Sequence, residues 1–356
     1  MEHRVTIKDI AVEAGVSTGT VHRALYGKKG LSEQTRQQIL ELCARRGYRA
    51  NSAASALKRN ALRIAAAFPA PQGESFYFYG SVWRGFRRCM AELDDYNLEL
   101  VELPYYPATP NGQAEILSAC FARYNGKIDA LLTVGPTEDD ARRAVQRYSD
   151  AGVPVFFACD DAEGCGRAAC VQADYDMTGR VAAELLSSQL LPGSAVLLCA
   201  GDARTPSHYR MATGFEAYLR ENGVPLTLVK IDGYQDKPAL TAHLDQTLAE
   251  NTQITGACSV SARLSVLLAD AVARAGRAGQ VRVVASDLFR ETVRNMEEGL
   301  VQNILYKDPA QQAYLAARLM GDCVLRGIQP PAEVQYVESR VIFQSSLAYY
   351  RASGSI

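Results

Sequence analysis

The chain has 356 residues, of which 48% are hydrophobic, and its 38 lysines and arginines nearly balance its 39 aspartates and glutamates. A chain of this length can bury more than one hydrophobic core, so we expect two or three domains. No apolar run follows Met1, and no apolar stretch reaches about 18 residues, which argues against a secretory signal peptide and a membrane-spanning helix. We therefore expect a cytoplasmic protein with no membrane partner.

The near-neutral net charge hides a strong asymmetry along the chain. Residues 1–60 hold 11 lysines and arginines against five acidic residues, a charge of +6, and the remaining residues hold 27 against 34, a charge of −7. A basic end on an acidic body is typical of a DNA-binding arm. A solvated basic tail is the alternative, and the helix signals through the same residues argue against it.

The nine cysteines and four histidines do not indicate a metal site. The cysteines are odd in number and scattered, and none of them forms a CxxC pair. This pattern fits reduced thiols in a cytosolic protein. We expect neither a metal nor another cofactor.

The first 25 residues predict two short helices joined by a glycine turn. Thr6 and Asp9 have the spacing of a helix N-cap and its reciprocal partner. Gly15 suits the left-handed residue that ends the first helix, and Ser17 can cap the second, with Val21 on its buried face. Two such helices make a helix-turn-helix, whose second helix has the size to enter the DNA major groove.

A third helix is expected after Ser32, with Ile39, Leu42 and Cys43 facing inwards, and Gly47 ends it. The segment that follows consists mainly of small residues. It contains one large apolar side chain, Leu57, followed by two cations.

This order resembles the lactose-repressor (LacI) family of bacterial transcription factors. The matching positions are 5–11, 14–17, 20–21, 23–25, 35–36, 47–48, 51 and 56–57. The resemblance implies a helix-turn-helix headpiece at residues 1–50 and a hinge helix or linker at 51–61. It also implies a homodimer that binds a near-palindromic operator in double-stranded DNA.

The same resemblance implies which residues contact DNA. The residues expected to do so are Thr6, Ser17, Thr18, Gly19, Thr20, His22, Arg23, Asn51, Ala54, Leu57 and Lys58. Arg23 can donate two hydrogen bonds to guanine, Leu57 can wedge into the minor groove, and Lys58 can neutralise phosphate. His22 stands where the family usually has serine. The alternatives are a phosphate contact for Arg23 and packing on the core domain for Leu57.

From Leu62 onwards, apolar runs alternate with amphipathic segments of helical length. Strands are predicted at 63–68, 99–103, 130–134, 155–158, 195–200, 227–231, 256–259, 281–285 and 301–305. Such alternation predicts an α/β fold with parallel sheets covered by helices on both faces. Nine units are too many for one sheet of average size, so we expect two lobes.

Residues 62–356 resemble the type I periplasmic sugar-binding-protein fold that forms the regulatory core of this family. The resemblance implies a proximal lobe of about 62–172 and 307–330, and a distal lobe of about 173–306 and 331–356. Ligands of open α/β sheets bind outside the carboxyl ends of the strands, so an effector is expected between the lobes.

Aromatic faces with fixed carboxylates and arginines suit a sugar or a sugar derivative. The predicted effector-binding residues are Phe78, Tyr79, Asp161, Arg167, Arg210, Ser261, Asp287 and Tyr306. Tyr306 stands where the family often has Gln or Asn, and Tyr175 replaces an Asn, which argues against a standard hexose or pentose. Surface or structural hydrogen bonding is the alternative role for each polar member.

An enzyme is disfavoured by the motifs that are missing. The first strand runs into Pro69–Gly73 and not into a GxGxxG turn, and the chain has no P-loop and no GxSxG elbow.

The predicted function is a transcriptional regulator, most often a repressor in this family, that responds to a small ligand. The alternative is a soluble binding protein or sensor without DNA output.

Overall fold

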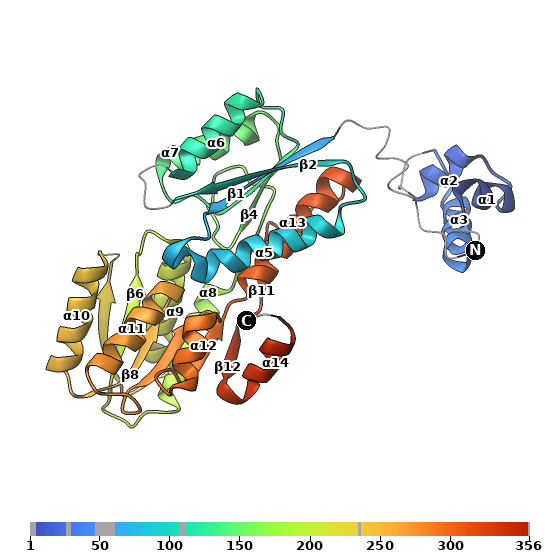
Figure 1. Cartoon of the computed structure of the whole chain (residues 1–356). Helices are drawn as coiled ribbons and strands as arrows, with labels where there is room; N and C mark the ends of the chain where they lie inside the picture. Colours follow the sequence, from blue (N-terminus) through green and yellow to red (C-terminus); the bar gives the residue numbers. More distant parts are fainter. Residues whose placement is uncertain (1–4, 26–29, 47–60, 107–111, 234–235, 355–356) are drawn as a thin grey trace.

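The computed structural model describes residues 5–25, 30–46, 61–106, 112–233 and 236–354 (Figure 1). The hinge prediction, with Asn51, Ala54, Leu57 and Lys58, lies outside these ranges. So do Gly47, which was expected to end the third helix, and the side chain of His22.

The headpiece consists of α1 (Ile7–Glu13), α2 (Thr18–Leu25) and α3 (Glu33–Arg45). The predicted capping box is present: the Thr6 N–H donates to Asp9 Oδ2 at 2.7 Å, and the Asp9 N–H donates to Thr6 Oγ1 at 3.4 Å. Gly15 has a φ of 64°, which turns the chain between the first two helices. Ser17 and Ser32 cap α2 and α3 through their hydroxyls, as expected.

A small hydrophobic core holds the three helices together. Ile10 on α1, Val21 on α2 and Ile39 on α3 are at most 1% exposed, and Leu42 and Cys43 are also buried. One large apolar residue from each helix therefore meets at a common centre, and this packing orients α2.

The proximal lobe is a six-stranded parallel sheet in the order β11-β5-β4-β3-β1-β2. Its strands are β1 (Leu62–Pro69), β2 (Leu98–Tyr105), β3 (Ala130–Thr133), β4 (Val155–Ala158), β5 (Ala169–Ala173) and β11 (Val334–Val337). Its helices are α5 (Phe76–Glu92), preceded by the 3₁₀ turn η1 (Gly73–Ser75), α6 (Gly112–Arg123), α7 (Asp139–Asp150) and α13 (Pro309–Arg326). α5 and α13 share one core with the sheet, and α6 and α7 share another, so both faces are covered.

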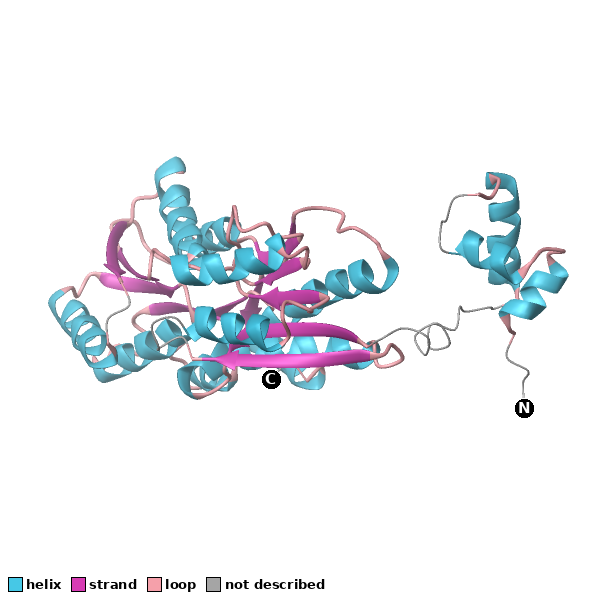
Figure 2. Ribbon diagram, turned by 90° about the horizontal axis from the view of Figure 1, so that it is seen from above, coloured by secondary structure: helices cyan, strands magenta, loops and turns pink. Residues whose placement is uncertain are grey.

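The distal lobe is a second six-stranded sheet in the order β12-β10-β9-β8-β6-β7. Its strands are β6 (Ala195–Gly201), β7 (Thr227–Asp232), β8 (Ile254–Ser259), β9 (Arg282–Ser286), β10 (Asn303–Tyr306) and β12 (Arg340–Phe343), of which only β12 runs antiparallel to its neighbour. Its helices are α8 (Tyr175–Ser187), α9 (Pro206–Glu221), α10 (Lys237–Glu250), α11 (Ala262–Arg274), α12 (Arg290–Glu297) and α14 (Leu347–Ala352), the last preceded by η2 (Gln344–Ser346). Figure 2 shows the strands of the two lobes enclosed by helices.

All nine predicted strands are present, and three more were missed. β5, β11 and β12 have only four or five residues, and each contains a Gln or an Arg, so none of them is an uninterrupted apolar run. One lobe boundary was wrong. Residues 331–356 were expected in the distal lobe, but β11 pairs in parallel with β5 and extends the proximal sheet.

The chain therefore crosses between the lobes three times: between β5 and α8, between β10 and α13, and between β11 and β12. Asp308 links the second crossing to the third. Its carboxylate accepts hydrogen bonds from the Tyr306 hydroxyl at 3.0 Å and from Arg340 Nη2 at 2.5 Å. It also caps α13 through the Gln311 N–H at 3.1 Å, from a left-handed backbone with a φ of 51°. At the first crossing, Thr178 exchanges a hydrogen bond of 2.7 Å with Ser339.

Glycines allow two pairs of helices to cross closely. A Cβ at Gly85 on α5 would lie 1.9 Å from the carbonyl oxygen of Ala310 on α13. A Cβ at Gly179 on α8 would lie 2.0 Å from the carbonyl oxygen of Met211 on α9. The backbones approach too closely at both crossings for any side chain.

No helix in the described part of the chain is both long enough and apolar enough to cross a membrane.

We predict that Gly179→Ala destabilises the protein by about 1–3 kcal/mol, because the added methyl group must push α8 away from α9. The matched control is Gly80→Ala on α5, where the Cβ meets only the ring of the exposed Phe76, at 3.1 Å. That control should be neutral or should gain up to about 1 kcal/mol from helix propensity. Urea unfolding of both variants is the measurement, and equal midpoints would contradict the close-crossing argument.

Candidate functional site

The headpiece presents the first turn of α2 outwards. Ser17, Thr18, Gly19 and Arg23 are exposed, and Thr20 is half-buried. Arg23 Nε donates to the carbonyl oxygen of Gly19 at 3.3 Å, so the guanidinium lies along its own helix. These five residues therefore lie at the accessible N-terminal end of α2, the end with which a recognition helix contacts base edges.

Thr6 and Ser17, two of the predicted DNA contacts, cap helices with their side chains. The Thr6 hydroxyl donates to Asp9 Oδ2 at 2.7 Å within the capping box of α1. The Ser17 hydroxyl lies 2.9 Å from Thr20 Oγ1 and accepts from the Thr20 N–H at 3.1 Å. Both side chains hold the ends of helices, and any contact with DNA is an additional role.

In the distal lobe, the carboxyl ends of β8, β9 and β10 meet at a buried lysine. Lys307 is 4% exposed, and its ammonium donates to Ser286 Oγ at 2.6 Å and to the carbonyl oxygen of Val260 at 3.0 Å. It also pairs with Asp287 Oδ2 at 3.1 Å. Asp287 was predicted from the sequence and Lys307 was not, because its neighbour Tyr306 was chosen at this position.

Asp287 is the buried carboxylate of this site. It has a φ of 68°, its N–H donates to the carbonyl oxygen of Leu305 at 2.9 Å, and its own carbonyl accepts from the Thr292 hydroxyl at 2.9 Å. Burial raises the pKa of Asp287, and the positive charge of Lys307 opposes that shift. Hydrogen bonds from Lys307 and Ser286 to this carboxylate also oppose the rise of its pKa.

Serines connect the strand ends beneath the lysine. Ser265 exchanges a hydrogen bond of 2.7 Å with Ser259, and its hydroxyl accepts from the Ser286 N–H at 2.7 Å. Ser261, a predicted effector contact, is the N-cap of α11, and its carbonyl accepts from the Ser265 hydroxyl at 2.9 Å. Ser261 therefore has a structural role here.

The proximal lobe contributes adjacent carboxylates after β4. Asp161, which was predicted, accepts two hydrogen bonds from Arg167, one of them 2.7 Å from Nη2, and a third from the Ala162 N–H at 2.8 Å. The two predicted residues thus form a closed pair within their own lobe. Asp160, which was missed, reaches across to the distal lobe: its two oxygens accept from the Ser207 N–H at 2.8 Å and the Ser207 hydroxyl at 3.1 Å.

Aromatic residues on α5 approach the distal lobe. Tyr77 stacks on Phe289 with ring centroids 4.7 Å apart. Phe78 lies edge-on to Tyr79 at 5.2 Å, and its ring centroid is 6.0 Å from Lys307 Nζ. Of the predicted aromatic pair, Phe78 therefore faces the charged group, and the residue that stacks across the lobes is Tyr77.

Two other predicted residues lie away from the lysine. The Tyr306 ring is 5.9 Å from that of Tyr350 in the distal core, because successive residues of β10 point to opposite faces. Arg210 lies at the rim, where its side chain is 39% exposed and pairs with Glu163 of the proximal lobe at 3.5 Å. Tyr175 donates from its buried hydroxyl to the carbonyl oxygen of Cys159.

Ion pairs also cross the rim between the lobes. Glu74 in the proximal lobe pairs with Arg263 at 2.6 Å and with Lys237 at 3.0 Å in the distal lobe. Arg204 of the distal lobe lies 3.5 Å from Glu138 of the proximal lobe. The lobes are thus held together by direct contacts at the rim and by the bond between Asp160 and Ser207 further inside.

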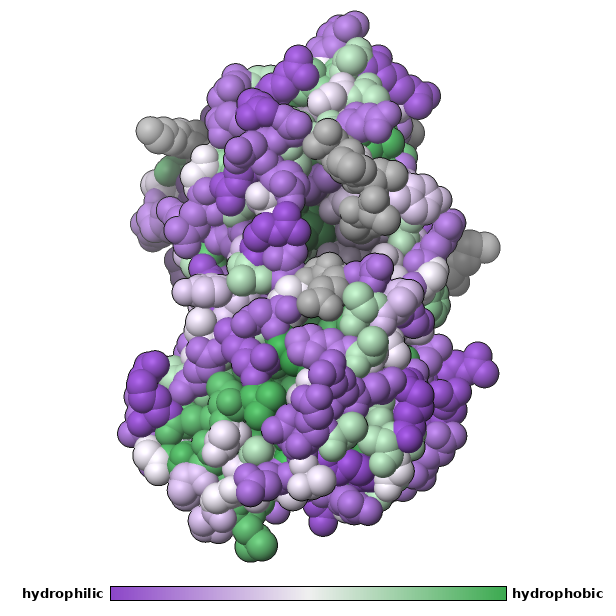
Figure 3. All heavy atoms as spheres, turned by 90° about the vertical axis from the view of Figure 1, so that its left-hand side faces the viewer, coloured by the Kyte–Doolittle hydropathy of each residue, from purple (hydrophilic) through white to green (hydrophobic). Residues whose placement is uncertain are grey.

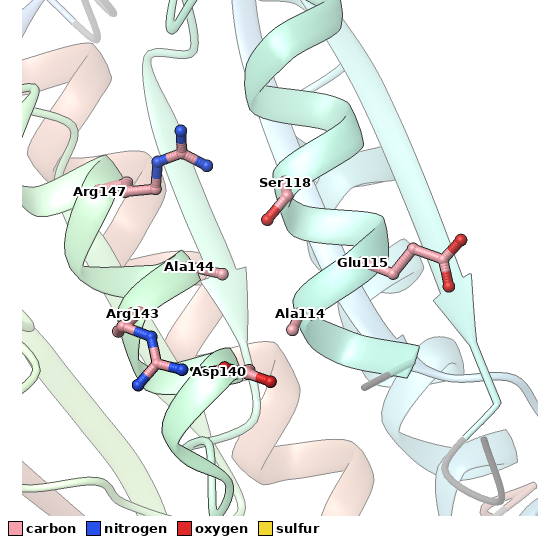
Figure 4. A pocket seen from close by; sticks show the side chains of 7 residues that line it. All are labelled: Ala114, Glu115, Ser118, Asp140, Arg143, Ala144 and Arg147. Carbon is pink, nitrogen blue, oxygen red and sulfur yellow. Dashed lines mark hydrogen bonds and ion pairs between the residues drawn. The ribbon is translucent and has the colours of Figure 1, made fainter. Parts of the chain in front are cut away.

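A separate surface pocket lies between α6 and α7 of the proximal lobe (Figure 4). It is lined by Ala114, Glu115, Ser118, Asp140, Arg143, Ala144 and Arg147, and Arg143 pairs with Asp140. It shares no residue with the predicted effector set. In the described part of the chain, no group of three or more His, Cys, Asp or Glu side chains is placed to hold a metal ion.

Known protein families match both parts of the chain. Residues 67–326 match the family described as periplasmic binding protein domain, and residues 6–51 match bacterial regulatory proteins, lacI family. Catabolite control protein A of Priestia megaterium is 25% identical over 225 residues, which are 62% of this chain and 63% of the relative. HTH-type transcriptional regulator DegA of Bacillus subtilis is 25% identical over 224 residues, 63% of each chain. The matches span less than two thirds of these relatives.

Solved structures confirm the expected two-lobe fold. The glucose-galactose binding protein GanP from Geobacillus stearothermophilus has a TM-score of 0.70 at 19% identity, covering 81% of this chain and 99% of its own. A solute binding protein from Bacillus halodurans with bound myo-inositol has a TM-score of 0.70 at 16% identity, covering 82% and 97%. At such identities the similarity establishes the fold alone.

His208 on α9 provides a pH test of this region. Its Nδ1 accepts from the Asp202 N–H at 3.2 Å. Burial and the nearby charge of Lys307 lower its pKa to about 4. The unfolded chain takes up this proton near pH 6.5 and the folded protein only near pH 4, so the stability present above pH 6.5 is lost as the pH falls between these values.

We therefore predict that His208→Gln reduces the loss of stability between pH 7 and pH 4, by up to about 3 kcal/mol. Denaturant unfolding at both pH values is the measurement. His243→Gln, which alters an exposed histidine on α10, should retain the pH dependence of the parent. If both variants behaved like the parent, the pKa of His208 would not be lowered in the folded protein.

Proposed function

The chain belongs to the periplasmic binding protein family and carries a lacI-family regulatory domain, and we propose that it is a sequence-specific, DNA-binding transcriptional regulator. A small ligand, a sugar or a sugar derivative, controls its affinity for the operator from a site between the two lobes. The observation that carries this proposal is the combination of an outward-facing α2 with two facing lobes, of which the distal one holds the buried Lys307–Asp287 pair at its strand ends.

The lobe contacts supply a physical route for control. A ligand shifts an equilibrium only through different affinities for two states. The closed arrangement has direct contacts between the lobes, from Asp160 to Ser207 and from Glu74 to Arg263. A ligand that contacts both lobes adds to these contacts and favours closure. Coupling of this kind is typically about 1–3 kcal/mol, which corresponds to changes in affinity of about 5- to 150-fold.

A homodimer on a near-palindromic operator is the assembly that fits one headpiece per chain. Two-fold symmetry in the protein matches two-fold symmetry in the site, and a single headpiece reads few base pairs. Figure 3 shows hydrophobic residues gathered on one area of the lower lobe, and such areas are typical of contacts between proteins. The expected location is the cytoplasm, with the nucleoid.

A sensor without DNA output is the second candidate, favoured by the similarity to transport-associated solute binding proteins. Selection of binding sites from random double-stranded DNA, followed by gel shift, separates the two. Enrichment of a near-palindromic sequence supports the regulator, and binding without sequence preference would favour the sensor.

We predict that Arg23→Ala costs about 1–3 kcal/mol of discrimination at one base pair per half-site, since a bidentate contact to guanine is lost. Affinity for the selected operator and for random DNA is the measurement. The control is Arg45→Ala, an exposed arginine in the last turn of α3, which should weaken binding to both DNAs alike. An equal loss on both DNAs for Arg23→Ala would identify Arg23 as a phosphate contact.

We further predict that Asp287→Ala binds the operator like the parent but no longer responds to ligand. Arg210→Ala should retain part of the response, because its side chain lies at the rim and is 39% exposed. The measurement is operator affinity with and without a sugar identified by thermal shift. A full response from Asp287→Ala would mean that the effector binds elsewhere.

A further inference from the structure

The ion pairs that join the two lobes share one polarity. Among the described residues, and apart from the three crossings of the chain, each pair has its carboxylate on the proximal lobe and its cation on the distal lobe. The pairs are Glu74 with Arg263 and with Lys237, Glu138 with Arg204, and Glu163 with Arg210. The carboxylates follow β1, β3 and β4, and the cations follow β6, β7 and β8, so an acidic rim faces a basic rim.

Two of the distal cations lie where their own helices disfavour them. Lys237 is the first residue of α10, and Arg263 is the second residue of α11. The N-terminus of a helix carries a partial positive charge, which favours acidic residues and opposes basic ones. Neither helix has an acidic residue in its first turn. The helices themselves therefore do not explain these cations, whereas the carboxylate that they meet on the other lobe does.

Glu74 is the centre of the strongest contact across the rim. Its Oε2 lies 2.6 Å from Arg263 Nε, and its Oε1 lies 3.0 Å from Lys237 Nζ. Burial raises the pKa of Glu74, but the hydrogen bonds and charges of Lys237 and Arg263 outweigh this effect and lower it below its usual value. The carboxylate is therefore charged at neutral pH. These three side chains form what we call the rim clasp.

Exposure separates the rim clasp from the other pairs. The Arg263 side chain is only 17% exposed, whereas Arg204 and Glu163 are 74% and 79% exposed. Arg204 also pairs with Asp202 of its own lobe at 2.7 Å. Exposed ion pairs contribute little to stability, and salt screens them readily. The rim clasp is thus the main electrostatic contact between the lobes, and the outer pairs add a weaker attraction.

Salt acts on the rims and hardly on the contacts further inside. Charges in water attract each other over about 10 Å at 0.1 M salt but over only about 3 Å at 1 M. When the lobes separate, the charges of both rims are in water, so salt weakens the force that closes them again. The bond from Asp160 to Ser207 and the stacking of Tyr77 on Phe289 are less affected, because Asp160 is buried and the stacked rings carry no charge.

We propose that the oppositely charged rims form an electrostatic latch, which holds the lobes closed without help from an effector and which monovalent salt loosens. The rim clasp is its main part. If the chain has the function proposed above, on which this consequence depends, ionic strength is a second input to the lobe equilibrium that controls operator binding.

The backbone N–H of Ser207 reports directly on lobe closure. It donates to Asp160 Oδ1 of the other lobe at 2.8 Å. Ser207 is the second residue of α9, and the first N–H groups of a helix have no acceptor within the helix. Its hydrogen exchange is therefore slow only while the lobes are closed. The reference is the N–H of Met177, which donates to Asp174 Oδ1 at 3.0 Å within a single helix cap.

The test is amide hydrogen exchange of the dialysed full chain, without DNA or sugar, in KCl from about 50 mM to about 1 M. We expect the exchange rate of Ser207, divided by that of Met177, to rise at least about threefold over this range. The use of a ratio removes effects of salt on exchange chemistry and on overall stability.

Glu74→Lys places three cations together and should raise the same ratio about tenfold or more at low salt, because like charges oppose closure. Glu74→Gln should give a smaller increase and a weaker dependence on KCl. Adding Arg263→Glu and Lys237→Glu to Glu74→Lys restores opposite charges and should slow the exchange again. The matched control is Asp245→Asn, which removes an exposed ion pair with Arg274 inside the distal lobe and should behave like the parent.

The proposal is overturned if the ratio in the parent does not change with KCl, or if Glu74→Lys exchanges like the parent. It is also overturned if the charge-reversed triple variant exchanges as fast as Glu74→Lys, or if Asp245→Asn has the effect of Glu74→Gln. The experiment contains no DNA, so a chain without operator binding would give the same exchange rates. Failure of the latch is thereby distinguished from failure of the regulatory function.

Discussion

The structure depends on three crossings of the chain between two parallel sheets. Asp308 fixes the second and third crossings together, because its carboxylate accepts from Tyr306 and Arg340 and also caps α13. A single side chain thereby joins β10 of the distal lobe to α13, the longest described helix of the proximal lobe. The carboxyl ends of both sheets are consequently held facing each other, and relative motion of the lobes is limited to bending at these crossings.

Because these ends face each other, charged residues far apart in the sequence become neighbours. Asp160 reaches Ser207, and Lys307 lies against Asp287 with the ring of Phe78 behind it. Such groups are stable in a buried site only when most of their hydrogen-bonding capacity is satisfied.

The site could be predicted only in part from the sequence. Asp287 and Phe78 were predicted from the resemblance to the family, and the structure places both beside Lys307. Lys307 was missed in favour of Tyr306, since the strand it follows was placed without knowing which face each residue would occupy. Asp160 was missed in favour of Asp161, because adjacent carboxylates cannot be ranked until their partners are known.

The sequence by itself determined the local elements: the cap formed by Thr6 and Asp9, the turn at Gly15, the alternation of strands and helices, and the basic headpiece on an acidic body. These features depend on residues close together along the chain. Only the tertiary structure decided that β11 extends the proximal sheet and that Lys307 pairs with Asp287. Strand order and the face of each side chain follow from contacts between distant segments, which periodicity along the chain does not encode.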